Sequence, residues 1–292
     1  MPFTFSNDHL MSDDEFCLLR DCIYGHCGIY FDSDSKYILE KRLSKRLTDL
    51  NLLSYYDYYH YLKYNRNKDQ ELMDIMDVLT TNETYFFRES FQLKAFTDEI
   101  IPELIKVKGS HGSRSLRIWS AGCSTGEEPY TIAMLLTGIL ELRGWNIEII
   151  GTDISQRVLQ HARRGVYGKS SFRATEEHYL REFFVPQEDG FRVSDSIRKL
   201  VTISHLNLFD NGRMTMLGKM DIIFCRNVII YFDQAAKKQV VESFHNALYD
   251  GGFLLLGHSE SLMNLTTNFT LRHFKNDMIY QKPDRIFSGG PK

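Results

Sequence analysis

Apolar residues recur at helical spacing in the first part of the chain, behind residues that favour helix starts. Ser12 and Glu15 match a capping box, in which each side chain bonds the backbone amide of the other, and Gly28 is placed to end that helix. Further helices are predicted over 35–50, from Ser54 to 64, and over 69–80. The second is expected to bury a stripe formed by Tyr37, Ile38, Leu43, Leu47 and Leu50. This part of the chain is therefore predicted to be entirely helical.

After about residue 90 the pattern changes to short apolar runs that alternate with amphipathic segments. A helix over 91–107 and a polar connector over 108–114 lead into this region. The apolar runs are 116–119, 147–153, 200–204, 221–225 and 253–257, and helices are expected over 127–142, 155–164 and 234–248. Strands that alternate with helices predict an α/β fold with a parallel sheet covered on both faces.

Two stretches depart from this alternation. Residues 183–194 hold two β-rich pieces around a Glu-Asp-Gly turn, which predicts a small antiparallel insertion at about 167–199, and 269–274 with 278–281 predict a closing hairpin. The expected organisation is a helical domain over 1–88, an α/β domain over 89–285, and a flexible tail over 286–292.

Composition excludes several classes of protein. The 292 residues carry 35 Lys and Arg against 38 Asp and Glu, for a net charge of -3, so no concentrated basic surface for nucleic acid is expected. The chain has no apolar run long enough to insert in a membrane and no apolar stretch typical of a secretory signal. The five cysteines, among them Cys17, Cys22 and Cys27, fit neither a disulfide framework nor zinc-ligand spacing. We therefore expect a cytoplasmic protein without a metal site.

The end of the first predicted strand carries candidate ligand-binding residues. Gly122 and Gly126 lie four residues apart, which is not the G-x-G-x-x-G spacing, and no P-loop lysine follows. Glu127 and Glu128, at the start of the next helix, would repel a pyrophosphate but suit a cationic ligand, which disfavours a nicotinamide dinucleotide. The alternative is that these carboxylates only complement the helix dipole.

Polar residues also follow the other strands. Asp153 ends the second strand, where an acidic side chain is placed to accept both ribose hydroxyls of an adenosine, although strand-end aspartates also cap helices. The next strands end at Asn207-Leu208 and in the segment 225–232. An adenosine that carries a positive sulfonium, S-adenosylmethionine (SAM), fits this acidic lining.

Five motifs in order resemble the CheR family, the chemoreceptor glutamate O-methyltransferases. They are TNETYFFRE (81–89), WSAGCSTGEEPY (119–130), GTDI (151–154), CRNVIIYFD (225–233) and GHSE (257–260). The resemblance covers about residues 12–282. It implies a helical N-terminal domain and a Rossmann-like class I SAM-dependent methyltransferase domain with an inserted β-subdomain.

The resemblance also implies roles for individual residues. Arg88 and Tyr231 would lie nearest the transferred methyl group, although Tyr231 has the alternative role of an aromatic plug after a strand. The glycine-rich turn varies in the family, so Glu127 stays open as an alternative to Glu128. The cofactor-binding residues implied are Asn82, Thr84, Arg88, Glu128, Asp153, Asn207, Leu208, Arg226 and Asn227.

The implied reaction is methyl transfer from SAM to a receptor glutamate, which gives a methyl ester and S-adenosylhomocysteine (SAH). A glutamate has a pKa of about 4.3 and is already ionised at neutral pH, so no general base is needed. His258, Ser259 and Glu260 are adjacent in the chain and cannot face one another as a triad, which indicates a loop after a strand.

Partner contacts are expected on the second helix, where Lys41, Arg42, Lys45 and Arg46 would steer the acidic helices of a chemoreceptor. On charge alone, a solvated helix face is an equal alternative. In some family members the β-subdomain also binds a receptor C-terminal pentapeptide by strand addition. Two rival functions remain: a methyltransferase for a small molecule or another protein, and a non-catalytic adaptor that binds SAM or SAH.

Overall fold

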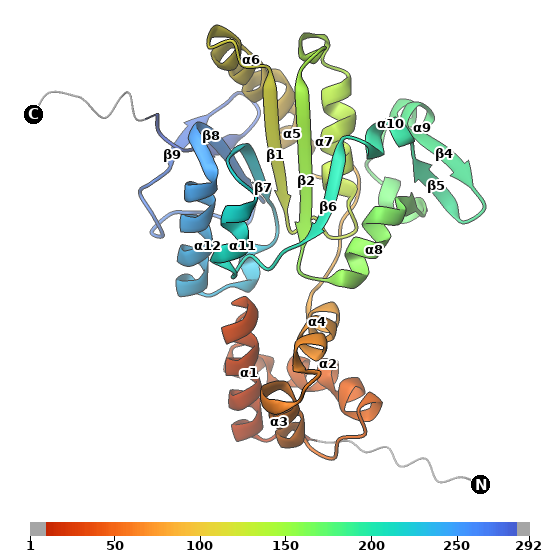
Figure 1. The fold of residues 1–292 in the computed structure, drawn as a ribbon, viewed down its shortest axis with the longest axis vertical. Helices are drawn as coiled ribbons and strands as arrows, with labels where there is room; N and C mark the ends of the chain where they lie inside the picture. The colour runs from red at the N-terminus through yellow and green to blue at the C-terminus, as the bar shows by residue number, and fades with distance from the viewer. Residues whose placement is uncertain (1–9, 285–292) are drawn as a thin grey trace, which may run out of the picture. The chain divides into compact units, whose positions relative to one another are not determined.

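The computed structural model describes residues 10–284 and divides into two compact units (Figure 1). Unit 1 comprises Met1–Thr81 with Tyr231–Asp233, and unit 2 comprises Asn82–Ile230 with Gln234–Lys292. The division falls between Thr81 and Asn82, whereas the boundary expected from the sequence follows residue 88. The difference arises because Phe86 and Phe87 belong to the apolar core of unit 2. The tail expected over 286–292 lies outside the described residues.

Unit 1 contains the four helices that the sequence predicts. The capping box is confirmed: Ser12 and Glu15 bond each other's backbone amides, and Gly28 ends the first helix with a left-handed backbone at φ 74°. The helices are α1 (Asp13–Cys27), α2 (Lys36–Asp49), α3 (Tyr55–Tyr64) and α4 (Lys68–Leu79).

The buried stripe of α2 differs from the prediction. Leu39, Leu43 and Leu47 are fully buried, whereas Tyr37 is 68% exposed, so its predicted burial is wrong. Residues four apart lie on one face of a helix, and a residue two positions before Leu39 points to the opposite side. The stripe therefore begins at Leu39.

A buried ion pair joins the helices of unit 1. The Arg46 guanidinium donates Nε to Glu71 Oε1 at 2.9 Å and Nη2 to Glu71 Oε2 at 2.5 Å, and the Tyr58 hydroxyl donates to Glu71 Oε1 at 2.6 Å. Glu71 is 3% exposed, so its carboxylate depends on these donors. One arginine, one tyrosine and one glutamate thus connect α2, α3 and α4.

Unit 2 is built on a seven-stranded sheet of order β6-β2-β1-β7-β8-β10-β9. Its first five members run parallel, and β10 pairs antiparallel with both β8 and β9, which confirms the predicted parallel sheet and closing hairpin. The strands are β1 (Ser115–Ala121), β2 (Asn146–Asp153), β6 (Val201–His205), β7 (Met220–Cys225), β8 (Leu248–Leu256), β9 (Thr270–His273) and β10 (Met278–Gln281).

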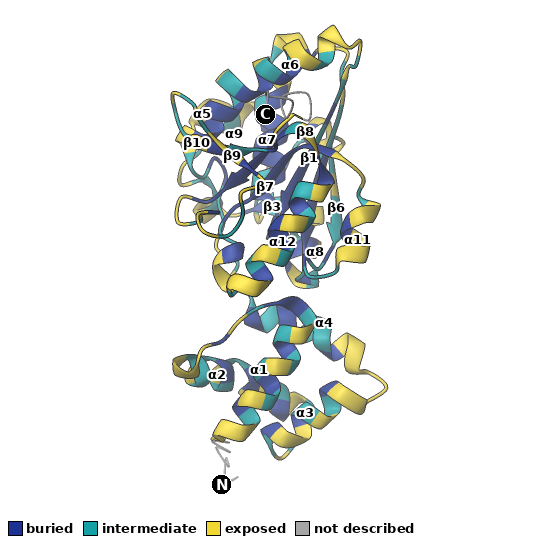
Figure 2. Ribbon diagram, turned by 90° about the vertical axis from the view of Figure 1, so that its left-hand side faces the viewer, coloured by how far each residue is buried: buried dark blue, intermediate teal, exposed yellow. Residues whose placement is uncertain are grey.

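Helices cover both faces of this sheet, and its central strands β1 and β7 are buried (Figure 2). On β1, Trp119 packs edge-on against Phe244 of α12, while Phe224 of β7 packs against Phe96 on the other face. The helices are α5 (Ser90–Ala95), a π-helical turn (Phe96–Ile100), α6 (Ile101–Ser110), α7 (Glu127–Thr137), α8 (Gln156–Arg164), α11 (Asn211–Met216) and α12 (Gln234–Ala247).

A second, antiparallel sheet of order β3-β5-β4 confirms the predicted insertion. It consists of β3 (Val166–Tyr167), β4 (Phe184–Gln187) and β5 (Gly190–Val193), with the short helices α9 (Glu177–Phe183) and α10 (Asp195–Arg198) beside it. Phe86 packs against Tyr167, Phe172 and Phe184, so the chain that enters unit 2 is anchored on this subdomain. Among residues 10–284, no helix is both long and apolar enough to cross a membrane.

Candidate cofactor and active site

The parallel strands of unit 2 end side by side. Ala121 of β1 pairs with Thr152 of β2, Asp153 pairs with His205 of β6, and Ser120 pairs with Phe224 of β7. The loops that follow these strands therefore leave the sheet from neighbouring points at one edge. In open α/β sheets this edge is where ligands bind.

The loop after β1 turns tightly through two glycines with left-handed backbones, Gly122 at φ 78° and Gly126 at φ 95°. A Cβ on Gly122 would lie 2.3 Å from Val228 Cγ2, and one on Gly126 would lie 2.8 Å from Ala162 Cβ. Only glycine allows these approaches of backbone to neighbouring side chains. The turn therefore requires glycine at both positions.

Asp153 is buried where β2 ends, at 8% exposure. Its carboxylate accepts the Ser124 N–H at Oδ2 and the Ser155 N–H at Oδ1, each at 2.9 Å. Burial raises the pKa of Asp153, and hydrogen bonds from the backbone of Ser155 and Ser124 oppose this rise in part. Each carboxylate oxygen keeps a further lone pair, so Asp153 can still accept hydroxyl donors from a ligand.

Glu127 and Glu128 differ in their surroundings. Both oxygens of Glu127 accept hydroxyls, from Thr125 at 2.6 Å and Ser171 at 3.0 Å, and burial raises its pKa. Glu128 accepts the Ser120 hydroxyl at 2.7 Å and the Arg226 Nε at 2.5 Å. Glu128 is thus part of an ion pair, whereas Glu127 is held by neutral groups.

Arg226 links three segments of unit 2. Besides its bond to Glu128, the guanidinium donates Nη1 to the Arg88 carbonyl at 2.9 Å and lies 3.4 Å from the Glu89 carboxylate. Its side chain is 4% exposed, so the charge depends on these acceptors. The structure therefore joins two residues expected to bind the cofactor, Glu128 and Arg226, to each other.

The segment 82–89 carries Asn82, Thr84 and Arg88, and it lies against the loop after β1. The Ser124 hydroxyl donates to the Asn82 carbonyl at 3.5 Å, and the Phe87 N–H donates to the Thr131 hydroxyl at 3.2 Å. Arg88 donates Nη1 to the Glu83 carbonyl at 3.0 Å. Arg88 is half-buried, so its remaining donors are available to a carboxylate.

The loops after β6 and β7 complete the set in unit 2. Asn207 accepts the Phe209 N–H at 2.9 Å, which fixes the turn that carries the buried Leu208. Asn227 has a left-handed backbone at φ 60°, and its Oδ1 is buried without a hydrogen-bond partner. An orphaned buried amide oxygen is costly. A ligand donor such as a hydroxyl or amine of SAM would satisfy it, so the residues present fit this cofactor.

Tyr231 and the basic residues of α2 belong to unit 1. The Tyr231 carbonyl accepts the Tyr30 N–H at 3.0 Å, and its side chain is 37% exposed. Of the four basic residues expected to meet a partner, Arg42 donates to the Leu79 carbonyl and the Thr81 hydroxyl, and Arg46 holds Glu71. The other two, Lys41 and Lys45, are exposed.

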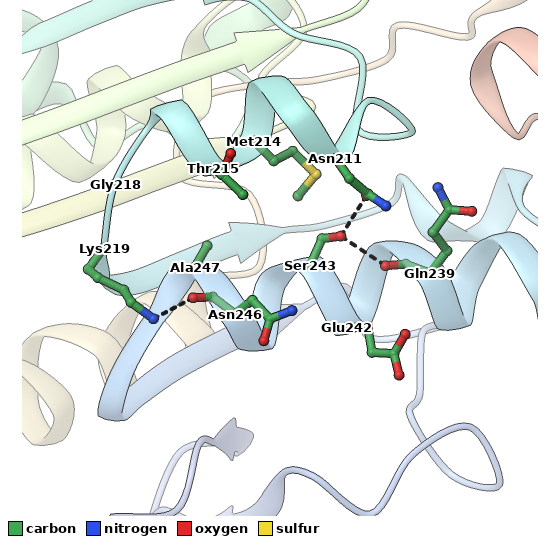
Figure 3. A pocket seen from close by; sticks show the side chains of 10 residues that line it. All are labelled: Asn211, Met214, Thr215, Gly218, Lys219, Gln239, Glu242, Ser243, Asn246 and Ala247. Atoms are coloured by element: carbon green, nitrogen blue, oxygen red, sulfur yellow. Dashed lines mark hydrogen bonds between the residues drawn. The ribbon is translucent and has the colours of Figure 1, made fainter.

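A separate hollow lies between α11 and α12, and Figure 3 shows its side chains. The Ser243 hydroxyl donates to Asn211 Oδ1 at 2.7 Å, and Lys219 Nζ donates to the Asn246 carbonyl at 2.5 Å. These bonds pair Ser243 with Asn211 and Lys219 with the backbone of Asn246. No residue predicted for the cofactor lines this hollow.

Three further side chains near the site were given no role in it from the sequence. Ser120 and Glu89 bond the Glu128–Arg226 pair, and Glu260 binds the backbone of the loop after β7. Ser120, Glu89 and Glu260 all lie inside the motifs quoted for the family resemblance, and this was the sequence signal that could have identified them. Their roles depend on contacts between segments far apart in the chain.

A parallel sheet with an acidic residue at the end of β2, a glycine turn after β1 and an orphaned amide after β7 match the site expected of a SAM-dependent methyltransferase. Comparison with family models agrees: residues 14–80 match the CheR methyltransferase all-alpha domain, and residues 82–278 match the CheR methyltransferase SAM-binding domain. The chain belongs to the CheR methyltransferase family.

Curated relatives are similar over most of their length. Chemotaxis protein methyltransferase 2 of Vibrio cholerae is 36% identical over 281 residues, which cover 96% of each chain. The chemotaxis protein methyltransferase of Borreliella burgdorferi is 37% identical over 259 residues, 86% of this chain and 89% of that protein. Chemotaxis protein methyltransferase 1 of Pseudomonas aeruginosa is 33% identical over 274 residues, 91% of this chain and 97% of that protein.

Proposed function

We propose that the protein methylates glutamate side chains of chemoreceptors with SAM, as a cytoplasmic step of chemotactic adaptation. The observation that carries this proposal is similarity to chemotaxis protein methyltransferases across both domains, at 36% identity over 96% of each chain for one relative. Arg88 in unit 2 supports it, because a guanidinium with free donors binds a carboxylate in a bidentate manner.

The chain's own residues would bind and orient rather than move protons. When bound, SAM supplies a methyl group on a positively charged sulfur. Asp153 accepts the ribose hydroxyls, and Asn82, Thr84 and Glu128 bind the methionine end, with Asn207, Leu208, Arg226 and Asn227 on the adenosine side. Arg88 orients the glutamate, which is already ionised at neutral pH. Tyr231, in unit 1, is the second residue that the family resemblance assigns to catalysis. Holding the two reactants in line contributes roughly 7–11 kcal/mol to such reactions.

A basic surface of α2 is the proposed docking site for the acidic receptor helices. Lys41 and Lys45 are exposed on a hollow that Arg42, Arg46 and Tyr37 also line. Since Arg42 and Arg46 are bonded within unit 1, we assign the attraction of a partner mainly to Lys41 and Lys45. Arg42 and Arg46 would shape this surface.

The antiparallel subdomain offers a second contact, to a receptor C-terminal pentapeptide. β5 is its central strand, so β3 and β4 are the edges to which an extended peptide adds. Pro186 removes one N–H donor from β4 and limits pairing along that strand, and Val185 beside it is 51% exposed. Loss of methylation only for receptors that carry the pentapeptide, after changes in this sheet, would support this contact.

The test is transfer of labelled methyl from SAM to receptor-containing membranes, followed by mild alkali. Carboxyl methyl esters hydrolyse in mild base, whereas N-methyl and ether linkages survive. Alkali-labile label on a receptor is the expected result. Alkali-stable label, or label on a small molecule, would assign another substrate. SAH binding without any transfer would favour a non-catalytic adaptor.

A further inference from the structure

The turn that follows β7 carries backbone N–H groups whose acceptor lies in another loop. The Asn227 N–H donates to Glu260 Oε2 at 2.8 Å, and the Val228 and Ile230 N–H groups donate to Oε1 at 2.9 and 3.3 Å. The Gly257 N–H adds a fourth bond, to Oε2 at 2.8 Å. One carboxylate therefore joins the loops after β7 and β8.

We infer that Glu260 is a positioning residue for cofactor binding, whose carboxylate holds the turn that carries Asn227 in its binding conformation. The inference rests on the proposed function only through the cofactor role of that turn. Asn227 has φ 60°, a left-handed backbone that is unfavourable for residues other than glycine, although less so for asparagine. The bonds to Glu260 offset this cost.

A carboxylate is the side chain that this arrangement requires. Four N–H donors from two loops need two oxygens with about four lone pairs between them. Burial raises the pKa of Glu260, and the N–H donors of Asn227, Gly257, Val228 and Ile230 oppose this rise. A glutamine would keep one oxygen and turn its NH2 group toward N–H donors, which leaves two of the four donors unpaired.

Gly257 provides the space for this contact. A Cβ at this position would lie 2.9 Å from Glu260 Oε2 and 3.0 Å from the Asn227 nitrogen. Its backbone is not left-handed, so the requirement is steric alone. The closing hydrogen bond from the Glu260 N–H to the Gly257 carbonyl, at 2.8 Å, completes a tight turn. Gly257 and Glu260 thus act together on Asn227.

The test compares the SAH affinity of wild type and Glu260→Gln by calorimetry on the full chain. We expect the Kd for SAH to rise about tenfold. This is the effect expected when binding must reorder a turn that has lost a buried hydrogen-bond acceptor. The matched control is Asp221→Asn at the opposite end of β7. Asp221 is 4% exposed, pairs with Lys108 and accepts the Arg117 N–H at 2.8 Å. Its substitution should lower the melting temperature without a change in Kd.

Gly257→Ala crowds the contact between Glu260 and Asn227 without changing the chemistry of either residue, and it provides a second test. A raised Kd in this variant supports the inference, even where Glu260→Gln does not fold. A wild-type Kd in a folded Glu260→Gln, or in Gly257→Ala, would overturn it, as would an equal rise in Asp221→Asn. Failure of the proposed function has a different signature, in which wild type binds SAH but transfers no methyl group to receptors.

Discussion

Substitution by methionine should have different effects at two neighbouring residues of α2. It should lower the stability of the protein at Arg46 and slow receptor methylation at Lys45. Lys45 is exposed, whereas the Arg46 side chain is 18% exposed and holds the buried carboxylate of Glu71. Arg46→Met would remove the guanidinium from the Glu71 carboxylate and leave the Tyr58 hydroxyl bonded to it. Removing one partner of a buried ion pair typically costs about 3–5 kcal/mol.

We expect the lower end for Arg46→Met, about 3 kcal/mol in the free energy of unfolding, because Tyr58 still donates and water reaches part of the site. For a unit of this size each kcal/mol shifts the melting temperature by about 4–8 °C, so a loss of more than about 10 °C should be visible by calorimetry. Far-UV circular dichroism in urea gives the free energy independently. A stability within about 0.5 kcal/mol of wild type would refute the structural role of Arg46.

Lys45→Met is the matched control, since it removes one positive charge from the adjacent position. Its stability should stay within about 0.5 kcal/mol of wild type, as for other exposed positions. Methylation of receptor membranes by this variant should slow at low salt and approach the wild-type rate at high salt, because exposed charges are screened. Equal rates at all salt concentrations would contradict the docking role of Lys45.

Three shorter predictions concern Asp153, the two residues proposed for catalysis and the buried cysteines. Burial raises the pKa of Asp153 above its ordinary value, so the affinity for SAH should weaken as the pH falls through that raised pKa. Calorimetry should show that Asp153→Asn binds SAH weakly and without this pH dependence. Arg88→Ala and Tyr231→Phe should slow methyl transfer by about tenfold or more with an unchanged circular dichroism spectrum, and wild-type turnover would remove them from the site. Burial raises the pKa of the Cys27 thiol to about 12, and it raises the pKa values of Cys123 and Cys225 well above the usual range. Iodoacetamide at pH 8 should therefore label the exposed Cys17 before these three thiols, which mass spectrometry would show.

The elements that follow from neighbouring residues could be predicted from the sequence. The capping box of Ser12 and Glu15 involves residues three apart, and the strands of unit 2 stand out as apolar runs between turn residues. The strand ends then located Asp153 and Asn227, because parallel strands present their carboxyl ends at one edge. These predictions need only local periodicity and one topological rule.

Contacts between distant segments could not be predicted in the same way. Arg226 and Glu128 are 98 positions apart, and the residue types do not tell whether each binds a ligand or the other. Arg46 stands among basic residues of α2, as a docking residue would. Its partner Glu71, however, lies 25 positions away on another helix. Charge pairing of this kind depends on the packing of whole elements, which sequence periodicity does not encode.

The return of residues 231–233 to unit 1 has a consequence for synthesis of the chain on the ribosome. Ile29 forms a bridge with Phe232, and the Tyr24 hydroxyl donates to Asp233 at 3.1 Å. The nascent N-terminal helices are therefore made long before the last piece of their unit leaves the exit tunnel. At about 5–20 residues per second, this interval lasts on the order of ten seconds. A fragment cut after Thr81 would lack that piece permanently, so its stability does not represent unit 1 in the full chain.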